Sequence, residues 1–262
     1  MAHALLSPQE PPAFHIERPN GSSSFVLTAD HASNRVPAQL GDLGLGAAEL
    51  ARHIGWDIGI ARVGHHLSEA LDACFVMQQY SRLVIDCNRP PGSPGSVLEV
   101  SERTRIPGNQ GVTEEARKQR EDEVFWPYHN RIREAVEDRL ARGQRCVMIA
   151  LHSFTPVYMD ERRSVEIGVL FERDARLAEP LLRLLRAEPE LNVGENAPYA
   201  MSLTTDFTMT THALERGLMH VELEIRQDLI GEDAQCAAWA QRLARWLPAA
   251  LELADKTDKA ST

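Results

Sequence analysis

Long apolar runs are missing from this chain of 262 residues. The most apolar stretch, 146–151, is far shorter than the roughly 20 residues that a membrane-spanning helix needs. The first residues, 1–7, have no basic segment, and their apolar stretch is too short for a secretory signal. The sequence therefore predicts a protein that neither crosses a membrane nor is exported.

Cysteine is scarce, and no two cysteines form a Cys-x-x-Cys pair, which argues against zinc-ribbon and thioredoxin-like sites. The four cysteines are Cys74, Cys87, Cys146 and Cys236. Three of them lie in apolar stretches, so we expect free, buried thiols and a reducing, cytoplasmic location.

Basic side chains are outnumbered: 28 Lys and Arg stand against 38 Asp and Glu, giving a net charge of −10. Such a balance argues against nucleic acid or an anionic membrane as a partner, although it allows a locally basic pocket. Hydrophobic residues make up 43% and charged residues 25% of the chain, as in ordinary globular proteins.

No linker, repeat or low-complexity segment divides the chain. The proline-rich residues 1–20 predict an irregular arm, and residues 255–262 predict a frayed polar tail. Between them, residues 21–254 are predicted to form a single domain.

Short apolar or β-branched runs alternate with stretches of helical periodicity. The predicted strands are 25–29, 75–77, 83–85, 146–151, 165–171 and 219–225. The predicted helices are 45–71, with breaks near Gly55 and Gly64, then 113–140 with Thr113 as N-cap, 175–186 and 233–253. This alternation predicts an α/β fold with a mainly parallel or mixed sheet, in which ligands bind beyond the carboxyl ends of the strands.

Two histidines, His31 and His152, end separate predicted strands, and Asp57 lies on a neighbouring predicted helix. Two imidazoles and a carboxylate are a ligand set that a catalytic zinc takes. His53, one helical turn before Asp57, is an alternative ligand. The other interpretation is that each histidine is structural, which is the one we favour for the His65-His66 pair.

Glu222 and Glu224 are two residues apart in a predicted strand, so both point to the same face. Buried carboxylates are costly unless they are paired or functional. One function that needs a carboxylate there is that of a general base beside a metal-activated water. The alternative is a pair of edge-strand salt bridges to arginine.

The segment Asp86-Cys87-Asn88-Arg89 combines a guanidinium fork with an amide donor, which suits a substrate carboxylate. Further arginines in nearby loops would add positive potential, or are simply solvated charges. They are Arg82, Arg103, Arg105, Arg162 and Arg163.

Six motifs together resemble the N-formylglutamate amidohydrolase family over residues 24–250. They are Asp30-His31-Ala32-Ser33, Trp56-Asp57, the stretch 81–90 that ends in Asn88-Arg89-Pro90, Leu151-His152-Ser153-Phe154, Asn196-Ala197-Pro198-Tyr199, and the stretch 222–229 that begins Glu222-Leu223-Glu224. The resemblance implies hydrolysis of an N-formyl or related N-acyl amino acid, with N-formyl-L-glutamate as the first candidate.

Three fragments are also similar to those of zinc carboxypeptidases. The segment His152-Ser153-Phe154 is similar to the one that carries their last zinc-binding histidine. Asn88-Arg89 is similar to their carboxylate-binding pair, and Glu224-Ile225-Arg226 to the segment of their catalytic base. This likeness implies a mixed sheet flanked by helices on both faces, and Glu224 rather than Glu222 as the base. The segment 31–34 departs from their His-x-x-Glu pair, so Asp57 is taken as the remaining ligand.

The resemblance implies a mechanism in which His31, Asp57 and His152 hold Zn²⁺ or another divalent metal. Glu224 would act as the base and Arg226, or the metal, would stabilise the oxyanion. Asn88 and Arg89 would bind the α-carboxylate of a small anionic substrate.

A second basic residue, Arg82, Arg103 or Arg105, would bind the side-chain carboxylate of a glutamate-like substrate. Tyr199 and His212 lie in a loop that would cover the site, where Tyr199 would donate a hydrogen bond and His212 is either a site residue or a structural cap. Two alternatives remain: a hydrolase for another N-acyl amino acid or small peptide, and a non-catalytic binding protein that keeps the pocket.

Overall fold

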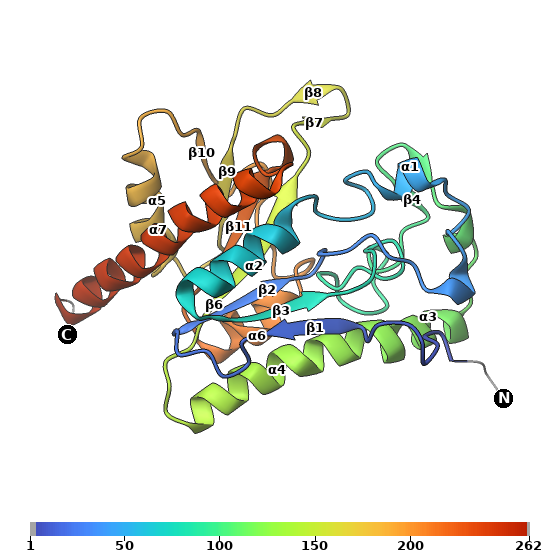
Figure 1. The fold of residues 1–262 in the computed structure, drawn as a ribbon, viewed down its shortest axis with the longest axis horizontal. Helices are drawn as coiled ribbons and strands as arrows, with labels where there is room; N and C mark the ends of the chain where they lie inside the picture. Colours follow the sequence, from blue (N-terminus) through green and yellow to red (C-terminus); the bar gives the residue numbers. More distant parts are fainter. Residues whose placement is uncertain (1–3, 261–262) are drawn as a thin grey trace.

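The computed structural model describes residues 4–260, and a seven-stranded sheet runs through its centre (Figure 1). The strand order is β1-β3-β2-β6-β11-β9-β10. The strands are β1 (Phe14–Glu17), β2 (Phe25–Ala29), β3 (Cys74–Gln78), β6 (Val147–Phe154), β9 (Ile167–Leu170), β10 (Val193–Glu195) and β11 (His220–Arg226). The four central strands, β3, β2, β6 and β11, are parallel, whereas β1 is antiparallel to β3 and β9 to β11. The predicted mixed, mostly parallel α/β sheet is confirmed.

Helices cover both faces of the sheet (Figure 1). One face carries α2 (Ile60–Leu71), α5 (Ala178–Arg186) and α7 (Asp233–Ala260), and the other carries α4 (Trp126–Ala141) and α6 (Thr208–His212). Because both faces are buried, successive residues of a strand enter different cores: Leu27 packs in one and Val26 in the other. This is why the central strands are apolar throughout rather than alternating.

Two small hairpins stand at the carboxyl ends of the parallel strands (Figure 1). They are β4 (Val100–Ser101) with β5 (Thr104–Arg105), and β7 (Val157–Tyr158) with β8 (Glu161–Arg162). Arg103 in the first hairpin forms an ion pair with Asp160 in the second, at 2.8 Å between Nη2 and Oδ2. The two hairpins therefore meet over the end of the sheet.

The predicted strand 83–85 is wrong, because this segment is a buried turn. Its carbonyl groups find side-chain donors in place of a neighbouring strand: Asn109 Nδ2 donates to the Leu83 carbonyl and Arg120 Nη1 to the Val84 carbonyl. Three apolar residues in a row indicated burial correctly but did not specify the conformation.

The predicted helix 45–71 is divided into α1 (Ala47–Leu50) and α2, with residues 51–59 outside both. The break near Gly55 is confirmed, but Gly64 lies inside α2, where its missing side chain leaves room for the Phe75 ring. The predicted helix 113–140 comprises α3 (Glu114–Arg120), a π-helical turn (Glu121–Phe125) and α4. Thr113 caps it as predicted, since its Oγ1 accepts from the Ala116 N–H at 3.2 Å.

The ends of the chain are more ordered than the sequence indicated. Part of the predicted irregular arm forms β1, which pairs with β3, while residues 1–3 lie outside the described residues. Of the predicted tail, 255–260 continue α7 and 261–262 lie outside the described residues. All four cysteines are free and buried, as predicted. Within residues 4–260, no helix combines the length and the apolar character that a membrane crossing requires.

Candidate active site

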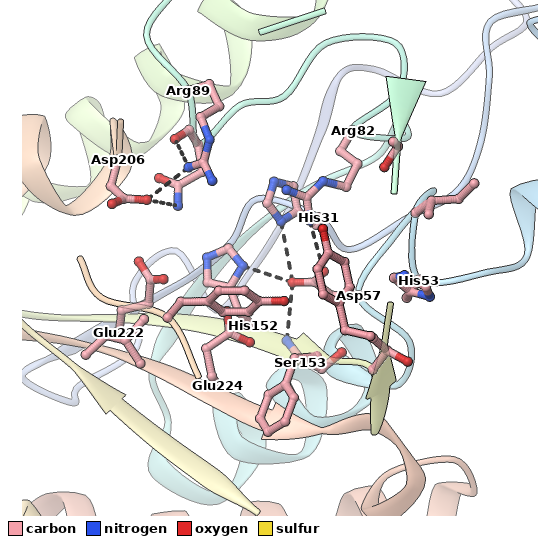
Figure 2. A pocket seen from close by; sticks show the side chains of 18 of the residues that line it. His31, His53, Asp57, Arg82, Arg89, His152, Ser153, Asp206, Glu222 and Glu224 are labelled. Atoms are coloured by element: carbon pink, nitrogen blue, oxygen red, sulfur yellow. Dashed lines mark hydrogen bonds and ion pairs between the residues drawn. The ribbon is translucent and has the colours of Figure 1, made fainter. Parts of the chain in front are cut away.

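A cavity of about 360 Å³ lies at the carboxyl ends of the central strands, where Ser101 of β4 and Tyr158 of β7 also line it. Figure 2 shows its lining side chains. Its walls include His31 after β2, His152 on β6, and Glu222 and Glu224 on β11. The position is the one expected for a parallel sheet, where the strand ends leave backbone and side chains free to face a ligand. The volume suits a small molecule rather than a folded partner.

The segment 51–59 brings Asp57 to the end of β2. Its backbone N–H donates to the His31 carbonyl at 2.9 Å, and one of its side-chain oxygens, Oδ2, accepts from the Ser153 N–H at 3.2 Å. Two strand ends thereby fix the orientation of the Asp57 carboxylate.

His31, Asp57 and His152 converge at this point, with one ligand atom of each within 4.8 Å of the others. The Asp57 Oδ2 atom lies 2.9 Å from His152 Nδ1 and 3.4 Å from His31 Nδ1 (Figure 2). All three side chains are buried. The structure thus brings together the three residues that the sequence predicted as metal ligands. His53 lines the cavity but is outside this group and lies 3.5 Å from Glu102.

The other nitrogen of each imidazole faces a second carboxylate. His31 Nε2 lies 2.7 Å from Asp86 Oδ1, and His152 Nε2 lies 3.2 Å from Asp30 Oδ2. Asp30 is itself held by Thr208, whose hydroxyl donates to its other oxygen at 2.7 Å. Carboxylates in this position orient metal-binding histidines, and the buried His31 Nδ1 has no hydrogen-bond partner of its own. Two nitrogens and one carboxylate, oriented in this way, fit a divalent cation.

In the metal-free protein the charges of these groups support one another. Burial alone would lower the pKa of His152, but Glu222, Asp30 and Asp57 hold it well above its usual value. Conversely, burial would raise the pKa of Asp30, yet contact with His152 lowers it to about 2. Because an imidazole must be neutral to bind a metal, loading the site would release protons.

Glu222 and Glu224 form the floor of the cavity on β11. In the sheet register Glu224 pairs with His152 and Glu222 with Ala150. They are 4% and 7% exposed, and the Oε2 atom of each is buried without a hydrogen-bond partner. Burial raises the pKa of Glu222 to about 7 and that of Glu224 to about 8. Within residues 4–260 neither forms a salt bridge, so the alternative of edge-strand ion pairs does not hold for them.

Asn88 and Arg89 also line the cavity, and Figure 2 shows Arg89 across from Glu222 and Glu224. Asn88 Oδ1 accepts from the N–H groups of Phe207 and Thr208, which orients the side chain. Arg89 Nη1 donates to Asp206 Oδ1 at 2.9 Å, and its side chain is 31% exposed. Arg82 also lines the cavity and is bound to Asp86 at 2.8 Å.

Two predicted site residues do not reach the cavity. The Arg226 guanidinium donates to Asp228 and to the carbonyls of residues 163–165, because the long side chain turns towards that loop at the strand end. The expected oxyanion role of Arg226 is therefore not supported. His212 stacks on His129 behind the cavity, with His212 Nε2 3.0 Å from His129 Nδ1, which fits its structural alternative.

The remaining predicted positions are at or beyond the rim. Tyr199 lines the cavity, and its hydroxyl accepts from Arg163 Nη1 at 2.6 Å. Arg103 is bound to Asp160, and Arg105 and Arg162 are exposed. His65 and His66 contact Glu17 and Asp233 on the surface, as the structural interpretation expects.

Sequence reasoning missed several residues of the site. Asp30 and Asp86 were part of the motifs but were given no role. The available signal for Asp30 was its position next to His31, whereas no local pattern links Asp86 to His31. Asp206 and Glu102 come from loops, and no local pattern marks them as part of a cavity.

Replacing Asp86 with asparagine should weaken metal binding. The amide cannot hold the His31 ring as an anion does, so we expect the affinity for Zn²⁺ to fall about 10- to 100-fold. Competition with a chromophoric chelator measures this change. Asp228→Asn is the matched control, because that carboxylate binds Arg226 away from the cavity. Equal affinities in the two variants, with both folded by circular dichroism, would contradict the positioning role.

The metal-free protein should lose stability as the pH rises from about 4.5 to 8. In this window the folded state keeps protons on Glu222 and Glu224 that the unfolded chain has released, so the free energy of unfolding falls with pH. The double variant E222Q/E224Q should show a smaller fall between pH 5 and pH 8. Urea denaturation at the two pH values measures the difference, and an equal or larger fall in the variant would argue against the raised pKa values.

Comparisons with known proteins identify the family of the chain. The family model described as N-formylglutamate amidohydrolase matches residues 23–231. The crystal structure of an Agrobacterium tumefaciens gene product superposes with a TM-score of 0.92 at 38% identity, covering 96% of this chain and 99% of that chain. An N-formylglutamate amidohydrolase from Ralstonia eutropha JMP134 shares the fold, with a TM-score of 0.66 at 20% identity, covering 95% of this chain and 100% of that one. No curated protein sequence matches. The family match covers most of the chain, and the chain therefore belongs to the N-formylglutamate amidohydrolase family.

Proposed function

We propose that this protein is a metal-dependent amidohydrolase that cleaves an N-formyl or other N-acyl amino acid. The observation that carries the proposal is the convergence of His31, Asp57 and His152 beside the unpaired carboxylate of Glu224 in one cavity. Zn²⁺ is the cation we expect, and another divalent metal would suit the same ligands. The free, buried cysteines agree with our further proposal of a reducing, cytoplasmic location.

When bound by His31, Asp57 and His152, a divalent cation supplies a Lewis acid for the acyl carbonyl and for water. Glu224 accepts a proton as the water oxygen adds to the acyl carbon. The same carboxyl group then gives this proton to the amine nitrogen as the C–N bond breaks. The products are the free amino acid and formate, or another carboxylic acid.

Arg89 and Asn88 would bind the substrate α-carboxylate. Arg89 is held against Asp206, which presents its guanidinium at the cavity wall. The Tyr199 hydroxyl lies at the rim and is fixed by Arg163, from where it can donate a hydrogen bond to a bound ligand. A cavity of about 360 Å³ suits one N-acyl amino acid.

N-formyl-L-glutamate, hydrolysed to glutamate and formate, is the substrate that the family favours. It would need a second cation for its side-chain carboxylate. One observation favours the alternative, an N-acyl amino acid with another side chain: among the described residues that line the cavity, both arginines, Arg82 and Arg89, are already bound to carboxylates.

Removing the metal should abolish hydrolysis. We expect zinc-loaded protein to release amine from a panel of N-formyl and N-acetyl amino acids, N-formyl-L-glutamate included, and a chelator to stop the release until Zn²⁺ is restored. Turnover that survives complete removal of the metal would contradict the proposal. If protein holding one metal per chain leaves the whole panel unhydrolysed, the alternative of a binding protein is favoured.

Glu224→Gln should lower kcat by about 10²- to 10⁴-fold, because the amide cannot accept the proton from water. Metal content should stay that of the unaltered protein, since Glu224 is not among the three ligands. Glu215→Gln is the control, because Glu215 is exposed and does not line the cavity. Steady-state kinetics with metal analysis separates the two effects, and a Glu224→Gln enzyme of normal rate would remove Glu224 from the mechanism.

A further inference from the structure

We propose that Glu222 selects the substrate side chain and that it receives a cation, an ammonium or guanidinium group at the end of that side chain. The inference rests on the proposed function, because it concerns the same cavity. It assigns the substrate class as N-acyl derivatives of basic amino acids rather than of glutamate.

Glu222 has what a ligand-binding carboxylate needs. It lines the cavity and is only 4% exposed, and its Oε2 atom is buried without a hydrogen-bond partner. A buried carboxylate without a partner is costly to the folded protein. A donor on a bound ligand would satisfy that atom, and nothing in residues 4–260 does so.

Besides burial, charges of both signs act on Glu222. Asp206 and Asp30 disfavour its ionised form, whereas His152 and Arg89 favour it. Glu224 lies two residues along the same strand, and the negative charge of Glu222 contributes to its raised pKa. His152 faces Asp57 and Asp30, and Arg89 is bound to Asp206, so both cations have carboxylate partners already. A side-chain carboxylate of the substrate placed beside Glu222 would be repelled by it.

The charges around a metal-loaded site also favour a cation beside Glu222. A divalent cation together with Arg82 balances the three carboxylates of Asp57, Asp86 and Asp30 that surround the metal ligands.

At the cavity wall, Arg89 balances Asp206, and Arg52 is bound to Glu102. Glu222 and Glu224 remain, and Glu224 is needed for proton transfer. Glu222 is therefore the carboxylate that remains free to pair with a cation on the substrate side chain.

Arg163 is a further cation at the rim, beside Tyr199. Its guanidinium is stacked among the rings of Phe154, Tyr158 and Tyr199 and donates to the Tyr199 hydroxyl. It is outside the residues that line the cavity. A glutamate side chain bound there would leave Glu222 without a partner.

The test compares N-formyl-L-lysine, N-formyl-L-norleucine and N-formyl-L-glutamate on zinc-loaded, full-length protein. Norleucine matches the length of lysine without its charge. If Glu222 binds the ammonium group, kcat/KM for the lysine compound should exceed that for norleucine by about tenfold or more, because a desolvated ion pair is strong. The glutamate compound should be the poorest. A highest rate on N-formyl-L-glutamate overturns the inference.

The variant Glu222→Gln should lose about tenfold or more on the lysine compound while norleucine changes by less than about threefold, because only the first makes the ion pair. Glu222→Asp, which keeps the charge, should recover part of the preference. Equal losses on both substrates would mean a merely structural role and would overturn the inference. Should Glu222→Gln fail to fold, the ranking of substrates by the unaltered protein decides alone.

A failure of the proposed function can be distinguished from a failure of this inference. If none of the three compounds is hydrolysed, calorimetric binding of N-formyl-L-lysine and N-formyl-L-norleucine to the zinc-loaded protein still tests Glu222. Tighter binding of the lysine compound, lost in Glu222→Gln, would uphold the side-chain preference without hydrolysis. Equal binding of the two compounds would overturn it.

Discussion

The site depends on one constraint: charges taken out of water must be paired with one another. Asp57, His31 and His152 are buried together at the end of the sheet, and each imidazole is held on its far side by Asp86 or Asp30. The loss of hydration of these groups is large, so an arrangement with any member missing would leave a buried charge unpaired. The network therefore fixes the rings in the orientation that a metal needs before any metal arrives.

The register of the strands determines where the side chains of this network lie. Glu224 stands beside His152 because β11 and β6 pair in parallel, and a shift of one residue would turn both glutamates to the opposite face. The strands are apolar on both faces except near their carboxyl ends, where the cavity interrupts the packing. The packing of the apolar strands thus stabilises the polar side chains at the cavity, which would not be stable without it.

The sequence predicted most of this where chemistry and strand position coincide. His31 and His152 were predictable because each ends a strand, and Glu222 and Glu224 because a two-residue spacing in a strand fixes the face. Asp57 was predicted as the remaining ligand on a helix, whereas it lies in the segment between α1 and α2. Arg226 and His212 were not, since the direction of a long side chain and the partner of a buried imidazole depend on the 163–165 loop and on His129, which are far away in the chain. The run 83–85 was misassigned because Asn109 and Arg120 satisfy its carbonyl groups, and a local pattern does not record distant donors.

Protons and metal ions compete for the same nitrogen atoms in this arrangement. In the metal-free protein the raised pKa values of His31 and His152 favour positive imidazolium groups between the carboxylates, and these charges take the place of a cation. Glu222 and Glu224 differ from the carboxylates of this network, because one oxygen of each, Oε2, is buried without a hydrogen-bond partner among the described residues. The protein therefore retains at the cavity floor two carboxylates that do not stabilise the fold, which is what a site built to act on a bound molecule requires.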